Sequence, residues 1–200
     1  MRSDHLESRS RRASLVPMAL LIALSVAGCF FDTRDPEQGT GEVCFKSVPS
    51  IEEDFVFGNM DGSMECLQAS TYLDQLADDF EFIPSPGAQA QYPDVFPVGE
   101  MFGPDKEELF LDRLFADADS IGSNLLLLEI NPPSGTTEVI FDAAYEFRVV
   151  SKDGSAITYS GEAFYTLRQE ATTWFMTRWE EKGGGTNPMG LLRGGLLQGG

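Results

Sequence analysis

Residues 139–181 constrain the fold most, because they form three alternating, aromatic-rich segments separated by turn signals. Successive side chains of a β-strand point to opposite faces, so this alternation predicts a half-buried sheet. The first two segments meet at Lys152-Asp153-Gly154, which is typical of a tight hairpin turn. The region therefore predicts an antiparallel β-meander.

The register of the first hairpin follows from its faces. A two-residue turn would place Phe147 opposite Ser160, whereas a three-residue loop with Gly154 in the left-handed conformation places it opposite Tyr159. A one-residue slip moves every apolar side chain of a strand to the other face, so we predict the three-residue loop. The further pairs are Val139–Leu167, Phe141–Tyr165 and Val149–Ile157.

The third segment, residues 174–179, extends the meander. With Leu167 opposite Trp174, Arg178 lies on the aromatic inner face and Trp179 on the outer face. An outer face that carries Trp179 and Phe175 predicts a covered surface, and a homodimer through this face is one expectation.

The preceding part of the chain predicts helices and short strands. Helices are expected at 50–57 and 63–77, separated by the breaker Gly58-Asn59-Met60-Asp61-Gly62, and at 104–118 behind Pro104. Strands are expected at 78–83 and 125–130, with a long loop over 85–103. Residues 183–200 contain eight glycines, which predicts no regular element without support, although their leucines favour partial docking.

The first 28 residues predict a signal peptide, with basic residues at 9–12 followed by an apolar run from 15 to 27. The run is too short for a stable transmembrane span. It ends in Leu-Ser-Val-Ala-Gly-Cys at 24–29, which resembles the lipobox of bacterial lipoproteins, and that resemblance implies lipidation of Cys29. Residue 30 is phenylalanine rather than aspartate, and the resemblance to lipoproteins of Gram-negative bacteria then implies transport to the outer membrane, facing the periplasm.

Residues 29–47 are expected to form the lipidated cysteine and a flexible tether. Cys44 and Cys66 are the other cysteines of the chain, and two readings stay open for them. The oxidising periplasm favours a disulfide between them, while the alternative is a pair of buried free thiols. Two cysteines alone make no metal site.

The charge of the chain argues against nucleic-acid binding. The formal net charge is −18, and removal of residues 1–28 leaves 10 basic and 30 acidic residues, net −20. Such a surface repels polyanions, while it favours solubility or a basic partner.

The sequence offers little catalytic chemistry. Its only histidine, His5, lies in the signal peptide, so a mature chain lacks the side chain best suited to proton transfer near neutral pH. Glu129 and Asp142 are candidate buried acids, although exposed strand charges are the simpler interpretation. Asp117-x-Asp119-x-x-Gly122 lacks the oxygen ligands of a calcium loop. We expect no catalytic residue, metal or cofactor.

The order of elements resembles a known family. The stretches Leu-Ala-Asp-Asp-Phe-Glu-Phe at 76–82, Tyr-Ser-Gly at 159–161 and Trp-Phe-Met-Thr-Arg-Trp at 174–179 are similar to nuclear-transport-factor-2-like (SnoaL-like, cystatin-like) domains of bacterial lipoproteins. The resemblance covers residues 48–182. It implies an α+β cone of about three N-terminal helices packed on a curved antiparallel sheet, with residues 183–200 as a separate tail.

In that family the cone encloses an apolar pocket. The resemblance implies that the pocket wall here consists of aromatic and basic side chains from the sheet and the long loop: Tyr145, Tyr159, Tyr165, Trp174, Arg178, Tyr92 and Phe96. An aromatic sheet face is more often plain core than a ligand site, so ordinary core is the stronger alternative for the same residues.

Three functions remain open on this basis. The favoured one is a lipid-anchored envelope protein that binds a small apolar ligand or a protein partner without catalysis. The others are a pocket enzyme of isomerase or hydratase type with a lone carboxylate, and a pure scaffold with a filled cone.

Overall fold

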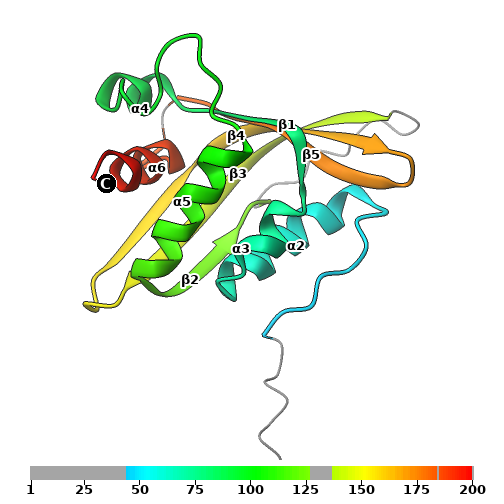
Figure 1. The fold of residues 1–200 in the computed structure, drawn as a ribbon, viewed down its shortest axis with the longest axis horizontal. Helices are drawn as coiled ribbons and strands as arrows, with labels where there is room; N and C mark the ends of the chain where they lie inside the picture. The colour runs from blue at the N-terminus through cyan, green and yellow to red at the C-terminus, as the bar shows by residue number, and fades with distance from the viewer. Residues whose placement is uncertain (1–43, 127–136, 184, 200) are drawn as a thin grey trace, which may run out of the picture. The chain divides into compact units, whose positions relative to one another are not determined.

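A five-stranded sheet that carries helices on its inner face forms the described part of the computed structural model, residues 44–126, 137–183 and 185–199 (Figure 1). The strands lie in the order β1-β5-β4-β3-β2. Their bounds are β1 Leu76–Ile83, β2 Ala118–Asn124, β3 Glu138–Ser151, β4 Ala156–Glu170 and β5 Thr173–Glu181. The helices are α2 Glu53–Glu65, α3 Ala69–Leu73, α4 Pro86–Gln91, α5 Pro104–Asp117 and α6 Met189–Gln198. The predicted signal peptide and Cys29 lie outside the described residues.

The β3–β4 hairpin has the predicted register. Phe147 pairs with Tyr159, and Val139–Leu167, Phe141–Tyr165 and Val149–Ile157 are paired as expected. Gly154 has φ +86°, and its N–H donates to the carbonyl oxygen of Ser151 at 2.8 Å. The left-handed glycine therefore closes the three-residue loop, and the alternating side chains of both strands fall on the predicted faces.

The register of β5 differs from the prediction. Leu167 pairs with Met176 rather than Trp174, and an irregularity follows, so that Thr166 pairs with Arg178 and Tyr165 with Trp179. The extra residue in this bulge switches the faces of the strand beyond it. Trp179 is therefore fully buried inside and Arg178 is exposed outside, which reverses the predicted positions of both.

The sheet is mixed rather than wholly antiparallel, because β1 runs parallel to β5. Met176 marks the start of this contact: it pairs with Leu76, and its N–H donates to the carbonyl oxygen of Gln75 at 2.9 Å. A parallel pair needs a long connection, and β2, β3 and β4 with their helices supply it.

The predicted break at residues 58–62 is absent, because α2 continues through it. The helix expected at 63–77 is wrong as a single element, since α2 ends at Glu65, α3 is a separate short helix and β1 already begins at Leu76. Gly62 lies in α2 beneath Phe45, where an added Cβ would come within 2.3 Å of the ring. The side chain of Asn59 accepts from the N–H of Val48 at 3.0 Å and donates to its carbonyl oxygen at 2.8 Å. These residues resemble a turn in sequence because their packing partner is the preceding segment of the chain.

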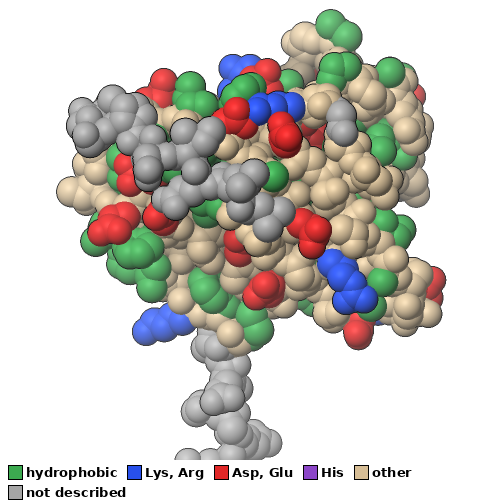
Figure 2. All heavy atoms as spheres, turned by 180° about the vertical axis from the view of Figure 1, so that it is seen from behind, with side chains coloured by type: hydrophobic (Ala, Val, Ile, Leu, Met, Phe, Trp, Pro, Cys, Tyr) green, Lys and Arg blue, Asp and Glu red, His purple; other side chains and the backbone are tan. Residues whose placement is uncertain are grey.

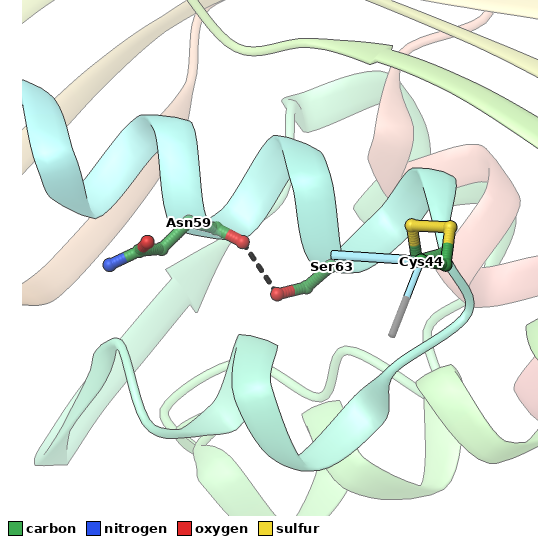
Figure 3. The surroundings of a disulfide bond; sticks show 4 residues. Cys44, Asn59 and Ser63 are labelled. Atoms are coloured by element: carbon green, nitrogen blue, oxygen red, sulfur yellow. Dashed lines mark hydrogen bonds between the residues drawn. A yellow bond between two sulfur atoms is a disulfide. The ribbon is translucent and has the colours of Figure 1, made fainter. Parts of the chain in front are cut away.

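A disulfide joins Cys44 to Cys66, the residue that follows α2 (Figure 3). It closes a loop with a sequence separation of 22 residues. A loop of this length restricts the unfolded chain and adds about 3 kcal/mol to stability in the chain-entropy model. The bond therefore holds the segment before α2 against the helix, beside Asn59 and Ser63.

The long loop of residues 85–103 contains more structure than expected. Its first part forms α4, where the Ser85 hydroxyl caps the helix by accepting from the N–H of Ala88. Phe96 and Phe102 are buried against Phe82, and the N–H of Phe82 donates to the carbonyl oxygen of Phe102 at 2.9 Å. The aromatic residues of the loop are thus part of the core.

Helix α5 begins at Pro104 as predicted, and it leads directly into β2. A strand was expected at 125–130, but β2 ends at Asn124, and residues 127–130 with Glu129 lie outside the described range. Asp117 and Asp119 lie at the junction of helix and strand, and no group of three metal-ligating side chains occurs in the described part of the chain.

The glycine-rich tail contains a ten-residue helix, α6, which packs against α4, α5 and β4 (Figure 1). Two of its glycines are required by close contacts, since a Cβ on Gly194 would lie 2.1 Å from the Tyr92 ring and one on Gly190 would lie 2.7 Å from the Glu181 carboxylate. Tertiary contact thus stabilises a helix that its composition does not favour. Among the described helices, none has the length and apolar character needed to cross a membrane.

The outer face of the sheet combines apolar and charged groups (Figure 2). Ile140 and Phe164 are exposed there, 55% and 38%. Lys182 lies 4.3 Å from the Phe164 ring centroid and forms ion pairs with Asp142 and Glu162. Asp142, a candidate buried acid, is therefore a half-buried partner of a lysine on this outer face.

Candidate functional site

The inner face of the sheet is filled with aromatic rings around Trp179. Its ring centroid lies 5.2 Å from that of Tyr165, 5.6 Å from Tyr145, 5.8 Å from Phe82 and 6.2 Å from Phe147. All five side chains are at most 1% exposed. The face that was expected to line an apolar pocket is therefore packed as a core.

A buried ion pair lies against this core. Arg193 of α6 donates from Nε to Oε2 of Glu107 at 2.8 Å and from Nη2 to Oε1 at 2.6 Å. Both side chains are 0% exposed. The Tyr72 hydroxyl also donates to Glu107 Oε1, at 3.0 Å. A bidentate guanidinium and a phenol thus satisfy a carboxylate that has no access to water.

Three rings surround the guanidinium of Arg193. Its Cζ lies 4.0 Å from the ring centroid of Phe82, 4.5 Å from that of Trp179 and 4.8 Å from that of Phe110. Planar guanidinium groups stack favourably on aromatic faces, and the effect is larger in a desolvated site. We call Glu107, Phe82, Phe110 and Trp179 the guanidinium cage.

A second buried carboxylate, Glu181 at the end of β5, holds the start of α6. It accepts from the N–H of Gly190 at 3.0 Å, from the N–H of Ser85 at 3.1 Å and from the hydroxyl of Tyr145 at 2.6 Å. The Tyr145 hydroxyl in turn accepts from the N–H of Met189 at 3.1 Å. A carboxylate at a helix N-terminus also interacts favourably with the helix dipole, so Glu181 stabilises the docked helix.

Both phenols of these clusters remain protonated donors. Burial raises the pKa of Tyr72, and the neighbouring Glu107 raises it further. Burial and the nearby Glu181 raise the pKa of Tyr145 in the same way. For Arg193, burial lowers the pKa but the attraction of Glu107 outweighs it, so the guanidinium stays charged.

Among the described residues, three buried polar atoms near the cage find no hydrogen-bond partner: Tyr165 Oη, Trp179 Nε1 and Arg193 Nη1. The interior thus retains donor capacity beyond what the chain uses.

A half-buried acid, Asp61, connects α2 to β2. Asp61 accepts from the hydroxyl of Ser123 and, through both its oxygens, from the N–H of Leu125 at 3.2 Å. Burial raises the pKa of Asp61 to about 6, although the two hydrogen-bond donors oppose the shift. Within the described ranges Asp61 has no cationic partner, in contrast to Glu107.

The predicted pocket-wall residues do not form one wall. Tyr145 and Tyr165 lie in the filled interior, and Trp174 is buried at the start of β5. Arg178 faces outward and pairs with Glu180 at 3.0 Å, because the bulge in β5 turned it away.

The other predicted wall residues lie at the level of α6 or in the core. Tyr92 is half-buried and contacts the backbone of α6 at Gly194. Tyr159 is also half-buried, and Phe96 lies in the core beside Phe82. Tyr92 and Tyr159 therefore border the docked helix rather than an open mouth.

Sequence reasoning missed the residues that organise the interior, Glu107, Arg193, Glu181 and Tyr72. One signal was present: Arg193 is the only charged residue of 183–200 and it stands among leucines and glycines. A lone charge in an otherwise apolar segment favours burial with a counterion.

A surface hollow of about 450 Å³ lies at the N-terminal end of α5. Its lining combines both charges with small and apolar groups: Asp78, Met101, Gly103, Pro104, Asp105 and Lys106. It contains no arrangement suited to proton transfer or metal binding.

Solved structures share this fold. A protein described as an aromatic ring hydroxylase from Novosphingobium aromaticivorans matches with a TM-score of 0.52 and 19% identity over 69% of this chain and 93% of its own. A protein described as a scytalone dehydratase from the same species matches with a TM-score of 0.51 and 13% identity, over 69% of this chain and 91% of its own. A conserved protein from Planctomyces limnophilus matches with a TM-score of 0.51 and 12% identity, over 64% of this chain and 90% of its own.

At these identities the likeness concerns the fold alone. The protein has the α+β fold of the nuclear-transport-factor-2-like domains, as the sequence resemblance implied. No protein-family model matches the chain, and no curated protein matches it.

Proposed function

We propose that this protein is a non-catalytic, lipid-anchored envelope protein whose domain binds a protein partner. The main observation behind this proposal is that α6 packs against the interior and binds the two buried carboxylates, Glu107 and Glu181. Glu107 is bound by Arg193, and Glu181 by the N–H of Gly190. With α6 docked, Glu107 and Glu181 are both engaged and aromatic rings fill the inner face of the sheet. Asp61, which has no cationic partner among the described residues, lies between α2 and β2 and is bound by Ser123 and Leu125.

The chemistry of these groups supports this proposal. A general acid or base must reach the proton that it transfers, within hydrogen-bond distance or through one water. Glu107 and Arg193 are 0% exposed and Glu181 is 4% exposed. Their geometry suits a structural role better than proton transfer to a bound molecule.

The charge of the chain supports a basic partner. The net charge is −18, and acidic side chains are spread over the outer face of the sheet (Figure 2). Complementary charge accelerates association and discriminates against acidic proteins. The partner that fits this surface best is therefore a protein with a basic contact region.

The anchor at Cys29 and the outer-membrane location are parts of the same proposal, and they rest on the lipobox resemblance. Several acyl chains on one cysteine give stable membrane attachment. We expect Cys29→Ser to abolish incorporation of labelled fatty acid and to release the chain from the membrane fraction. Membrane retention of this variant without lipid label would contradict the anchor.

The closed interior is tested with Nile red, a neutral apolar dye, on the full-length Cys29→Ser protein without detergent. We expect no saturable binding, while a matched variant truncated after residue 185 binds the dye. Saturable binding of one dye per intact chain, lost in a Tyr165→Trp variant that narrows the interior, would show an open pocket. That result would favour ligand binding or catalysis over the proposed function.

A further inference from the structure

The guanidinium cage has the construction of a recognition site. A carboxylate at 2.6 and 2.8 Å fixes the guanidinium edge, and three aromatic rings at 4.0–4.8 Å cover its faces. One guanidinium nitrogen, Arg193 Nη1, and the neighbouring Trp179 Nε1 are buried without a hydrogen-bond partner in the part of the chain that the structure describes. The charge and planarity of arginine are thus recognised by side chains that come from β1, α5 and β5, outside α6.

The helix that fills the cage depends on docking for its stability. Three of its ten residues, Gly190, Gly194 and Gly195, are glycines, which disfavour an isolated helix by about 1 kcal/mol each relative to alanine. Its N-cap residue, Pro188, offers no side-chain cap of its own, and the first N–H groups of the helix depend on Glu181 and Tyr145 of the sheet instead. A helix of this length and composition does not persist alone in water.

The connection between β5 and α6 allows movement of the helix without disruption of the sheet. Gly183, Gly185, Thr186 and Asn187 are exposed. In the described part of this connection, the N–H of Lys182 donates to the carbonyl oxygen of Glu162 at 2.8 Å. The N–H of Ser160 donates to the carbonyl oxygens of Thr186 and Asn187 at 3.2 and 3.1 Å. At the other end of α6, Arg113 donates to the carbonyl oxygens of Leu196 and Leu197 at 2.8 and 3.1 Å. A leaving α6 gives up the contacts with Ser160 and Arg113, the hydrogen bonds of Glu181 and Tyr145 to its first N–H groups, and its buried face.

We infer that the cage is a receptor site for an arginine side chain, which Arg193 occupies from within the chain and which an arginine-bearing helix of a basic protein partner occupies in exchange. This inference rests on the proposed partner-binding function. Simple departure of α6 would leave the Glu107 carboxylate among aromatic rings without a countercharge, which is strongly unfavourable. Exchange of one guanidinium for another restores the pair, so the site selects a partner that brings its own arginine.

The surroundings of α6 specify the partner further. Lysine cannot reproduce the bidentate contact or the stacking, because its ammonium group is a compact point charge. Tyr92 and Glu181 admit α6 closely only at Gly194 and Gly190. The incoming helix therefore needs small residues three positions before its arginine and one position after it.

The cage itself is tested by rescue of the full-length Arg193→Ala variant with ethylguanidinium. We expect its thermal midpoint to rise by about 3–5 °C at ten times the dissociation constant, with no rise for ethylammonium. Arg168→Ala, which removes an exposed arginine, is the matched control and gains nothing. Loss of the rescue in Arg193→Ala/Glu107→Gln supports the cage; equal rescue by both cations overturns it.

The exchange is tested with a labelled peptide that copies residues 189–198 and with a version that carries lysine in place of arginine. We expect the wild-type protein to bind the arginine peptide. The Arg193→Ala variant should bind it at least about tenfold more tightly, because the tethered competitor is gone. Both proteins should bind the lysine peptide at least about tenfold more weakly than the arginine peptide. Should Arg193→Ala fail to unfold cooperatively, Arg193→Lys replaces it with the same expectations.

Absence of peptide binding to wild type up to about 1 mM, the effective concentration of a tethered segment, overturns the exchange. This leaves the proposed function standing, because partner binding elsewhere and the closed interior are measured without the peptide. If the wild-type protein forms a dimer that Arg193→Ala abolishes, the arginine in the cage comes from a second copy of this chain. That result would overturn the proposal that a different protein supplies it.

Discussion

Two arginine–carboxylate pairs of this protein have nearly the same geometry in opposite surroundings. Arg193 binds Glu107 through two hydrogen bonds of 2.6 and 2.8 Å, with both side chains 0% exposed. Arg168 binds Asp79 through two hydrogen bonds of 2.9 Å, with side chains 35% and 60% exposed. The hydrogen-bond distances alone would suggest that the two pairs contribute equally to stability.

The difference in burial determines what each pair does. Water screens the exposed pair and solvates its members when they separate, so such a pair adds little to stability. The buried pair is costly to assemble and far more costly to break halfway, since removal of one member leaves an uncompensated charge in the core. The buried pair therefore decides whether α6 is docked, while the surface pair only connects β1 to β4.

The largest effect is expected for Arg193→Ala. It leaves Glu107 buried without a cation, and we expect a loss of about 3–5 kcal/mol in the free energy of unfolding. Urea denaturation monitored by tryptophan fluorescence measures it. The double variant Glu107→Leu/Arg193→Leu is the control, and it should recover most of the loss because it removes both charges. A single-variant loss no larger than that of Arg168→Ala would erase the distinction between the two pairs.

Asp61 offers an intermediate case, a half-buried acid without a cationic partner among the described residues. Its pKa in the folded protein is about 6, above the ordinary value of 3.8, so the folded state binds the proton more tightly than the unfolded state. Its contribution to stability is therefore complete below pH 3.8 and is lost as the pH rises through 6, by at most about 3 kcal/mol. We expect Asp61→Asn to remove this loss between pH 4 and pH 7.

The measurement for Asp61 is the unfolding free energy of wild type minus that of the variant, in urea, at intervals across this pH range. Asp153→Asn is the control, because the Ser155 side chain lowers the pKa of Asp153 and its contribution has the opposite sign. A pH-independent difference between wild type and Asp61→Asn would mean that Asp61 has an ordinary pKa.

Gly194→Ala tests how closely α6 must dock for the buried pair to form. The added Cβ would lie 2.1 Å from the Tyr92 ring, and such overpacking costs about 1–3 kcal/mol, reduced by about 1 kcal/mol through better helix propensity. Gly195→Ala is the matched control. Its Cβ meets nothing closer than the Tyr92 hydroxyl at 3.5 Å, so it should be neutral or stabilising. Thermal unfolding separates them, and equal midpoints would indicate that α6 tolerates displacement from Tyr92.

The smallest effect is expected for Arg168→Ala. Both carboxylates that it contacts, Asp79 and Glu170, remain in water after the substitution. We expect an unfolding midpoint in urea within the error of wild type. A loss comparable to that of Arg193→Ala would mean that the surface pair belongs to a stronger network than its exposure indicates.

The registers of the β3–β4 and β4–β5 strand pairs show where prediction from sequence succeeds and where it fails. The β3–β4 register followed from local information, because alternation and the Asp153-Gly154 turn agree on one pairing. The bulge in β5 carries no comparable local signal. The bulge exchanged the faces of Arg178 and Trp179, so Arg178 is no part of the expected pocket wall.

The candidate site was less predictable than the fold for a related reason. The cage is assembled from β1, α5, β5 and α6, which are far apart in sequence. Glycine and asparagine in α2 and glycine in α6 resembled turn or tail residues, although the structure uses them for close packing.

The sequence by itself determined the sheet hairpin, the aromatic inner face and helix α5, because each depends on neighbours within a few residues. It also predicted the α+β fold through its resemblance. Only the tertiary structure decided that the tail becomes α6, that Trp179 turns inward and that Arg193 closes the interior on Glu107. The physical reason is that a buried charge and a glycine-rich helix are stable only where distant parts of the chain meet them.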